Sequence, residues 1–371
     1  MSTIYIHWPF CISKCHYCDF NSVAADGVID FDFWLALYKT AIRKFLDDFY
    51  KNEQITSIYF GGGTPSILTP LFISEIITLI HDRCKLSEDV EITLEANPKT
   101  IDLPKADGFR SAGINRLSIG VQSLVEADLR ILGRKHGSSE AVSCVLEMSE
   151  IFGNISIDMI YNRPGQKLGA WIDELSAALS SLPIQHVSLY ELIVEDGTTL
   201  NKMIKDGILR EPSRESEFIE STWDTAENFG FHRYEISNFA KPGFEGRHNI
   251  SYWKYEDYYG IGPGAHSRIR RTDGRKMAVE QDGIIGNWVD RIKSGFNFEA
   301  TELSEEEEFR ERLIMGLRAD VGVDLNPDLI DRNKIQFLLK NSYIMLREDR
   351  VVLTNEGCLR LNLVVEYLSS K

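Results

Sequence analysis

The feature that most limits the fold is a repeated alternation of short apolar runs and longer segments with helical spacing between residues 4 and 230. The expected strands lie at residues 4–7, 57–60, 91–96, 116–120, 156–160 and 186–191. The expected helices lie at about residues 30–50, 70–83, 106–112, 138–152, 170–182 and 213–229. Such spacing is typical of βαβ units, so the sequence predicts a parallel sheet with right-handed crossovers.

Polar side chains follow several of these strands. Glu95, Gln122, Asp158 and Glu191 each stand at or just beyond a strand's carboxyl end. A barrel gathers its strand ends at one mouth, where active sites lie, whereas an open sheet spreads them along a line. We therefore predict an α/β fold built on a partial (β/α)6, TIM-like barrel occupying residues 1–235.

The pattern changes after Gly230. Residues 233–237 resemble one more strand, and Asp273-Gly274 is a typical hairpin turn, so residues 236–299 are expected to extend the barrel. Ser304 precedes an acidic helix start and Thr354 precedes a final helix to about residue 368, with a hairpin at 343–353 between them. This predicts a small α+β, winged-helix-like domain over residues 300–371.

Three cysteines near the amino end, Cys11, Cys15 and Cys18, follow the pattern C-x3-C-x2-C. Thiols this close can converge on one metal centre, and thiolates favour zinc or iron–sulfur clusters. Three ligands would leave one iron of a four-iron cubane open to another molecule. The alternative is a zinc knuckle with His7 or His16 as fourth ligand, although zinc prefers paired C-x2-C hooks. The isolated cysteines, which are Cys84, Cys144 and Cys358, are expected to be buried small hydrophobes.

With Tyr17 and the flanking sequences YIHWPFC and CDF, the cysteine motif resembles the radical S-adenosylmethionine (SAM) signature. Within that superfamily it resembles the oxygen-independent coproporphyrinogen III oxidase-like family, and specifically its heme chaperone branch. The resemblance implies a [4Fe-4S] cluster held by the three cysteines, with an open iron that binds the amino and carboxylate groups of SAM. It covers about residues 3–268.

Further segments resemble those that contact SAM in the family, including YFGGGTP, EANP, IGVQS, LGRKH and DMIYNRP. The SAM-binding residues that the resemblance implies are Tyr5, Tyr17, Gly62, Gly63, Thr64, Glu95, Gln122, Arg134 and Asp158. Taken alone, the glycine run is a tight turn and each charged residue a cap or a surface ion pair. One segment departs from the family, because Tyr-Asn-Arg-Pro stands after Met159-Ile160 where Tyr-Gly-Leu-Pro is usual.

A second constellation is HNISYW, which places His248 beside Tyr252 and Trp253. An imidazole can ligate heme iron, aromatic rings can stack on a porphyrin, and arginines can pair with its propionates. The candidate arginines are Arg247, Arg268, Arg270 and Arg271. The alternative is a hydrogen-bonded histidine in an aromatic loop, with the arginines on an exposed hairpin. HNISYW resembles the H-N-x-x-Y-W motif of the heme chaperone branch, which implies heme as a ligand.

Three functions compete. The first is a heme chaperone that carries a SAM-binding cluster and delivers heme to an acceptor protein, such as a respiratory enzyme. The second is oxygen-independent coproporphyrinogen III dehydrogenase, which decarboxylates propionates by radical chemistry. The third is a scaffold with a structural metal. The oxidases of the family carry a further cysteine two residues after the last ligand, where this chain has Phe20, and an extension before the motif. Both differences favour the chaperone.

Composition bounds the partners and the location. The formal net charge of -15 argues against nucleic acid as a broad surface partner. No apolar run approaches the length of a membrane span, and no signal-peptide pattern opens the chain. We therefore expect a cytoplasmic protein, in a compartment that keeps its thiols reduced.

Overall fold

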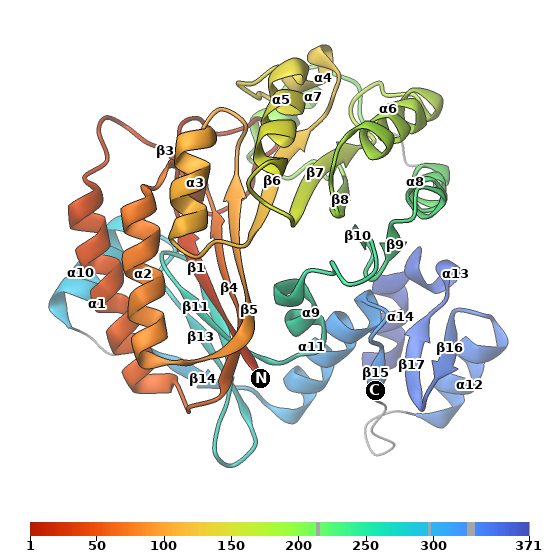
Figure 1. The fold of residues 1–371 in the computed structure, drawn as a ribbon. Coiled ribbons are helices and arrows are strands. Elements are labelled where there is room, and N and C mark those ends of the chain that lie inside the picture. The colour runs from red at the N-terminus through yellow and green to blue at the C-terminus, as the bar shows by residue number, and fades with distance from the viewer. Residues whose placement is uncertain (213–215, 296–297, 325–330, 371) are drawn as a thin grey trace.

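The computed structural model describes residues 1–212, 216–295, 298–324 and 331–370 of the chain (Figure 1). In this part of the chain one large sheet has the strand order β14-β13-β12-β11-β1-β4-β5-β6-β7-β8-β10-β9. Its central strands are β1 (Ser2–Trp8), β4 (Gln54–Gly62), β5 (Lys85–Ala96), β6 (Arg116–Gln122), β7 (Ile155–Tyr161) and β8 (His186–Glu191). These six strands pair side by side in chain order, and every pair is parallel. The predicted run of six βα units is confirmed.

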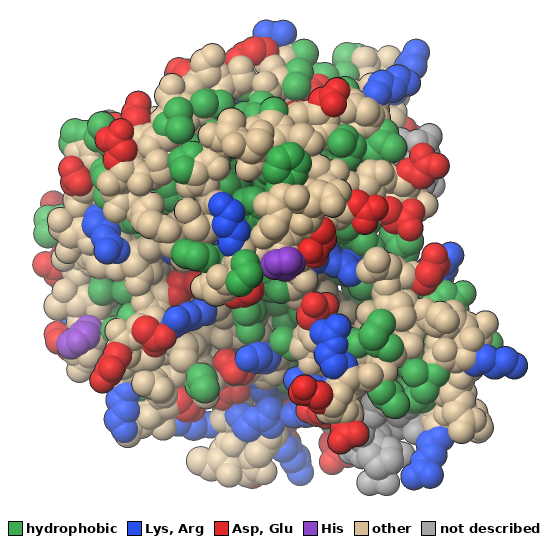
Figure 2. All heavy atoms as spheres, turned by 45° about the vertical axis from the view of Figure 1, so that its right-hand side comes forward, with side chains coloured by type: hydrophobic (Ala, Val, Ile, Leu, Met, Phe, Trp, Pro, Cys, Tyr) green, Lys and Arg blue, Asp and Glu red, His purple; other side chains and the backbone are tan. Residues whose placement is uncertain are grey.

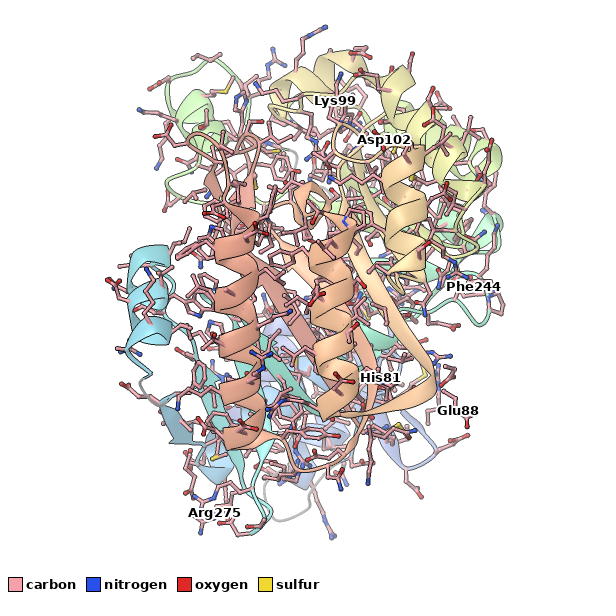
Figure 3. All side chains as sticks on the ribbon, turned by 60° about the vertical axis from the view of Figure 1, so that its left-hand side comes forward. His81, Glu88, Lys99, Asp102, Phe244 and Arg275 are labelled. Atoms are coloured by element: carbon pink, nitrogen blue, oxygen red, sulfur yellow. The ribbon has the colours of Figure 1, made fainter. Side chains whose placement is uncertain are left out.

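Helices cover the outer face of the six strands, as Figures 1 and 3 show. They are α1 (Phe31–Phe49), α2 (Pro70–Arg83), α3 (Leu103–Ser111), α5 (Ser138–Ser149), α6 (Leu168–Ser181) and α8 (Glu217–Asn228). The shorter helices α4 (Glu126–Ile131) and α7 (Thr199–Lys205) lie beyond the strand ends, at the top of Figure 1. The apolar stripes of the longer helices pack on the sheet; in α1, for example, Leu37, Ala41 and Phe45 are buried in the main core. Asp30 caps α1 by accepting a hydrogen bond from the Phe33 N–H at 3.0 Å.

The sheet curves but does not close, because its first and last strands, β14 and β9, are not paired with each other. The strands at its edges are β9 (His232–Arg233), β10 (Asn238–Ala240), β11 (Asp257–Ile261), β12 (His266–Arg270), β13 (Lys276–Glu280) and β14 (Ala300–Glu302). The expected hairpin at Gly274 joins β12 to β13. This is the partial barrel that the sequence predicts.

All six central strands run in one direction, so their carboxyl ends meet at one rim. Figure 3 shows Lys99 and Asp102, which follow the carboxyl end of β5, at the upper end of the molecule. Glu88, which lies near the start of β5, and His81, which lies near the end of α2, lie toward the opposite end. The polar residues predicted at strand ends therefore share the upper rim.

Two local predictions were wrong. Residues 233–237 are not one strand: β9 and β10 form an antiparallel pair, and the residues between them make the turn. The Glu235 carboxylate stabilises that turn by accepting from the Ser237 N–H at 2.8 Å. The final helix is also divided, into α13 (Asn355–Cys358), which Thr354 caps, and α14 (Leu361–Ser369). Arg360 breaks the run with a non-helical backbone, φ -123° and ψ 22°.

The C-terminal residues form a small α+β unit, drawn in blue at the lower right of Figure 1. It contains α11 (Glu305–Arg318), β15 (Val323–Asp324), α12 (Arg332–Lys340), β16 (Ile344–Arg347) and β17 (Arg350–Leu353). Its buried side chains, among them Leu313, Val351 and Val364, form a cluster separate from the main core. The expected hairpin is β16–β17. The domain boundaries at residues 235 and 299 stay predictions.

Candidate functional site

A cavity of about 540 Å³ opens at the carboxyl ends of the central strands and runs along the inner face of the sheet. Its walls come from β1, β4, β5, β6, β7, β8, the cysteine loop and helix α9 (Arg247–Trp253). All thirteen residues that the sequence singles out for cluster, SAM or heme line this one cavity: Tyr5, Cys11, Cys15, Tyr17, Cys18, Gly62, Gly63, Thr64, Glu95, Gln122, Arg134, Asp158 and His248. Their common location agrees with one composite site, while their roles as ligands stay predictions.

The three cysteines lie on the loop between β1 and α1. Two short strands, β2 (Phe10–Cys11) and β3 (Val23–Ala24), pair at its base, and Lys14 Nζ donates to the Ser22 carbonyl at 3.1 Å. Burial raises the pKa of the Cys11 and Cys18 thiols. Thiolates are the metal-binding form, so a cluster bound here would displace these protons. The donors present, three thiols facing one cavity, fit an iron–sulfur cluster.

The zinc alternative finds little support in the two candidate histidines. His7 Nδ1 lies 3.0 Å from the Tyr5 hydroxyl, and His7 Nε2 lies 2.9 Å from the Asn21 carbonyl. His16 Nδ1 lies 2.9 Å from the Ile131 carbonyl. Among the residues that the structure describes, no three His, Cys, Asp or Glu side chains are close enough to hold a single metal ion. A cubane, whose irons occupy separate corners, suits the spread thiols better.

The glycine run at the end of β4 lies against the cysteine loop. Gly62 has φ 112°, which favours glycine, and its N–H donates to Glu95 Oε2 at 3.1 Å. A Cβ at Gly63 would stand 2.7 Å from the Phe10 carbonyl oxygen and 3.0 Å from Cys11 Sγ. Bare backbone at this position therefore lets the strand end approach the thiols closely.

Two carboxyl groups, Glu95 on β5 and Asp158 on β7, line the same cavity. Glu95 Oε1 accepts from the Tyr59 hydroxyl at 2.9 Å, and Asp158 accepts from the Ser118 hydroxyl at 3.2 Å. Burial and then the charge of Asp158 raise the pKa of Glu95 to about 7. Burial also raises the pKa of Asp158. These groups can accept hydrogen bonds from hydroxyl or ammonium groups of a ligand, and near neutral pH Glu95 can hold or release a proton.

Gln122 and Arg134 complete the rim above β6. Gln122 ends the strand in a left-handed conformation, φ 68°. Arg134 Nη2 donates to the Gly120 carbonyl at 2.6 Å, and Arg134 Nη1 lies 3.3 Å from Cys15 Sγ. Arg134 Nε is buried and has no hydrogen-bond partner among the described residues. The guanidinium thus joins the strand end to the cysteine loop.

The segment that departs from the family pattern keeps its shape through a buried ion pair. Asn162, where glycine is usual, is left-handed at φ 57°, a conformation that asparagine tolerates better than most residues. Arg163, where leucine is usual, is buried and forms ion pairs with Glu174 and Asp128. Glu174 also accepts from the Ser123 hydroxyl and the Leu124 N–H, both at 2.7 Å. The replacement of leucine therefore anchors the turn that follows Gln122.

His248 lies on α9 at the opposite side of the cavity from the cysteines. Its ring stacks on Tyr59, with ring centroids 4.9 Å apart, and both of its nitrogens have partners. Nδ1 lies 2.8 Å from the Ser57 hydroxyl, and Nε2 lies 2.8 Å from the Tyr252 hydroxyl. Burial, and then the charge of Arg116, lower the pKa of His248 to about 3. The imidazole is therefore neutral, but it would have to exchange a hydrogen bond to ligate iron.

The four arginines considered for propionates are not brought to the cavity. Arg247 pairs with Asp89, Arg268 with Glu311, Arg270 with Glu308, and Arg271 with Glu302. Three of them lie on β12 or in its hairpin with β13, and the acidic partners of Arg268 and Arg270 come from α11. Carboxylates of the protein already neutralise these groups.

Sequence reasoning missed several cavity residues, namely Tyr59, Arg116, Ser118, Ser188 and Tyr190. A signal for two of them was present. Side chains alternate between the faces of a strand, so Arg116 and Ser118 must share the face of Gln122 on β6. Counting back in steps of two from Gln122 would have found both.

Comparisons with known proteins agree with this site. Residues 5–176 match the radical SAM superfamily. The chain is 36% identical to the heme chaperone HemW of Bacillus subtilis over 329 residues, which is 87% of this chain and 85% of that protein. It is 35% identical to the mitochondrial radical S-adenosyl methionine domain-containing protein 1 of Mus musculus, over 87% of this chain and 74% of that protein. The solved structure of coproporphyrinogen III oxidase (HemN) from Escherichia coli superposes with a TM-score of 0.82 at 21% identity, covering 100% of this chain and 90% of that one.

Proposed function

The chain belongs to the radical SAM superfamily and, within it, to the family that includes the heme chaperone HemW, and we propose that it is itself a heme chaperone. It would bind a [4Fe-4S] cluster, SAM and heme, and deliver the heme to an acceptor protein. Membership of the superfamily implies the cluster and SAM. The observation that carries the proposal is the single cavity in which the three cysteines, the SAM-type residues and His248 of HNISYW meet.

Each part of the cavity has a proposed task. Cys11, Cys15 and Cys18 would hold the cluster, which would supply an iron without a protein ligand for SAM to bind. Gly62, Gly63 and Thr64 offer backbone groups to the amino end of SAM, and Glu95 and Asp158 accept from its ammonium or ribose hydroxyls. Arg134 attracts its carboxylate. Tyr5, Tyr17 and Gln122 complete the walls of the SAM site.

The heme chaperone is favoured over the dehydrogenase by the residue at position 20. Phe20 lines the cavity with 59% of its surface exposed, where the oxidases of the family carry a further cysteine. An exposed aromatic ring at the mouth of the cavity can stack on a planar apolar ligand, but it offers no group for radical chemistry. The likeness to the HemN structure concerns the fold alone, so it does not favour the dehydrogenase over the heme chaperone.

The cluster is tested by anaerobic reconstitution with iron and sulfide, followed by metal analysis and absorbance spectra. We expect four irons per chain and the charge-transfer absorbance bands of an iron–sulfur cluster. Both should be lost in Cys11→Ala, Cys15→Ala and Cys18→Ala. Cys144→Ala is the matched control, because Cys144 is buried in α5 outside the cavity. A single zinc that survives all three substitutions would contradict the cluster.

Heme binding is tested by titrating the reconstituted protein with hemin. We expect a Soret shift in the wild type and a weaker complex in His248→Ala. Unchanged binding in that variant would show that heme binds to the protein but that His248 is not part of its site. Incubation with coproporphyrinogen III, SAM and a reductant tests the alternative, and robust turnover would favour the dehydrogenase.

The partners and location are proposed on similar grounds. The face drawn in Figure 2 carries acidic and basic side chains interspersed, which suits contact with a protein acceptor rather than a polyanion. No helix within the described residues is long and apolar enough to cross a membrane. Free thiols at a cluster site favour a reducing compartment, for which we propose the cytoplasm.

A further inference from the structure

Arg116 is the most unusual charged residue of the cavity. It opens β6, exposes only 3% of its surface, and lines the cavity on the same strand face as Ser118 and Gln122. Within the described residues its side chain forms no hydrogen bond and no ion pair, and its Nε is buried without a partner. A guanidinium carries five N–H donors and a permanent charge, so this side chain has a large unused binding capacity.

The groups around Arg116 do not use that capacity. His186 is bonded at both nitrogens, to the Ser156 hydroxyl and to the Tyr234 hydroxyl, each at 2.7 Å. His248 is bonded at both of its nitrogens as well. The positive charge of Arg116 helps to keep both imidazoles neutral, after burial, by lowering their pKa. Asp158, a carboxyl that lines the same cavity, is bonded to Ser118 and forms no ion pair with Arg116.

A neighbouring group on β5 is unsatisfied in the same way. Thr93 pairs in register with Arg116, so the two side chains stand side by side on the sheet. The Thr93 hydroxyl is fully buried and has no partner among the described residues. Thr93 is not among the residues that line the cavity, so of these two unsatisfied groups only the Arg116 guanidinium can meet an acceptor from outside the chain.

The free energy of burial makes this arrangement costly for a structural residue. Removing a cation from water without a partner is strongly unfavourable, and buried charges are normally paired. The other deeply buried arginine, Arg163, follows that rule through Glu174 and Asp128. A buried cation that faces a cavity and lacks a partner is what an anion-binding site requires before its ligand arrives.

We propose that Arg116 forms an anion subsite in the depth of the cavity that binds a carboxylate of the ligand. This inference rests on the proposed function in one respect, because that function supplies the candidate ligands, SAM and heme. Arg116 and Gln122 lie six residues apart on one strand, or about 20 Å. A SAM carboxylate bound at the cluster is therefore far from Arg116, and a propionate of heme is the better match.

The test uses cluster-reconstituted protein and four chains: wild type, Arg116→Met, Arg116→Lys and the control Arg247→Gln. Arg247 is an exposed arginine outside the cavity that pairs with Asp89. The ligands are hemin, hemin dimethyl ester, SAM and decarboxylated SAM. A charge-assisted hydrogen bond is worth about 1.5–3 kcal/mol, so we expect Arg116→Met to weaken hemin binding about 10- to 100-fold. Arg116→Lys should lose less affinity, and Arg247→Gln none.

The ester separates charge recognition from packing. Hemin dimethyl ester should bind wild type about as weakly as hemin binds Arg116→Met, and the substitution should not weaken the ester further. If the same pattern appears with SAM and decarboxylated SAM instead, the subsite stands and its carboxylate is that of SAM. The proposal is overturned if both acids bind Arg116→Met as tightly as they bind wild type.

Thermal unfolding distinguishes a binding role from a structural one. No protein partner is lost, so we expect Arg116→Met to melt at or above the wild-type temperature while it binds ligand more weakly. A much lower melting temperature in both Arg116 variants would assign the residue to structure and overturn the proposal. Wild-type protein that binds no hemin would contradict the proposed function, and the SAM titrations would then decide the subsite by themselves.

Discussion

Arg134 Nη1 lies 3.3 Å from Cys15 Sγ, although 119 residues separate the two in the chain. Hydrogen bonds to cluster sulfurs stabilise the more negative, reduced state and so raise the reduction potential. We expect Arg134→Gln to lower the potential of the reconstituted cluster and to weaken SAM binding roughly 10- to 100-fold. A redox titration followed by electron paramagnetic resonance measures the first effect. Arg130→Gln, an exposed arginine of α4, is the control. Equal potentials in wild type and Arg134→Gln would contradict the role of this contact.

SAM binding should depend on pH through Glu95, whose pKa is about 7. Below that pH the carboxyl is protonated and no longer accepts from a ligand ammonium, so affinity should fall about tenfold per pH unit. Calorimetric titrations of SAM from about pH 5.5 to about pH 8.5 measure this change in affinity. In Glu95→Gln the affinity should be lower at pH 8 and nearly flat below pH 7. A slope that persists in that variant would point to another group.

The same shift has a consequence for stability. The pKa of Glu95 is raised above its ordinary value of 4.5, so the folded state binds the proton more tightly than the unfolded state. Its contribution to stability is therefore complete below pH 4.5 and is lost as the pH rises through about 7. We expect the melting temperature of Glu95→Gln, relative to wild type, to increase across that window. A constant difference would argue against the raised pKa.

The Arg163–Glu174 ion pair should be essential to the fold of the loop after β7. Arg163→Leu restores the residue usual in the family but leaves Glu174 buried and unpaired, which typically costs about 3–5 kcal/mol. Urea unfolding measures the loss. In the double variant Arg163→Leu/Glu174→Gln the uncompensated charge is gone, and part of the stability should return. Lys205→Leu breaks an exposed pair with Asp196 and should change stability little. A similarly small effect of Arg163→Leu would show that the buried pair contributes nothing.

Gly63→Ala should damage the cluster site directly. The new Cβ would stand 2.7 Å from the Phe10 carbonyl oxygen and 3.0 Å from Cys11 Sγ, so the cysteine loop must move away. We expect a clear loss of iron per chain after reconstitution, with little change in helical content by circular dichroism. Gly286→Ala is the matched control, since no atom lies within 4 Å of its added Cβ. Full iron content in Gly63→Ala would mean that the loop tolerates the shift.

Tyr252→Phe tests how His248 becomes available to heme. The substitution removes the hydroxyl that occupies His248 Nε2 at 2.8 Å. If that nitrogen ligates iron, losing a competing hydrogen bond worth about 1 kcal/mol should tighten hemin binding about fivefold. Tyr258→Phe, which removes a tyrosine hydroxyl outside the cavity, is the control. Weaker binding in Tyr252→Phe would indicate that the hydroxyl itself contacts heme.

Prediction from sequence worked best where the signal was local. Strand periodicity and helix starts such as the one after Ser304 depend on residues close together in the chain, and both reappear in the structure. The predicted strand at 233–237 was wrong because a tight antiparallel turn and a strand have similar composition over so few residues.

Local sequence patterns could not predict which side chains form hydrogen bonds or ion pairs with each other. The partner of His248 Nδ1 is Ser57, 191 residues earlier, and Arg270 faces Glu308 rather than the cavity. The sequence equally gave no indication that Arg163 would find Glu174, or that Arg116 would find no partner among the described residues.

By itself the sequence determined the succession of strands and helices, and with it the rim at which cysteines, glycines and carboxyl groups converge. Parallel βαβ units leave little freedom in where strand ends point, so local pattern was sufficient. Only the tertiary structure decided which charges are neutralised, which histidine nitrogens are occupied and which cation is left unpaired. These outcomes depend on packing between segments far apart in the chain, where burial sets the free energy of every polar group.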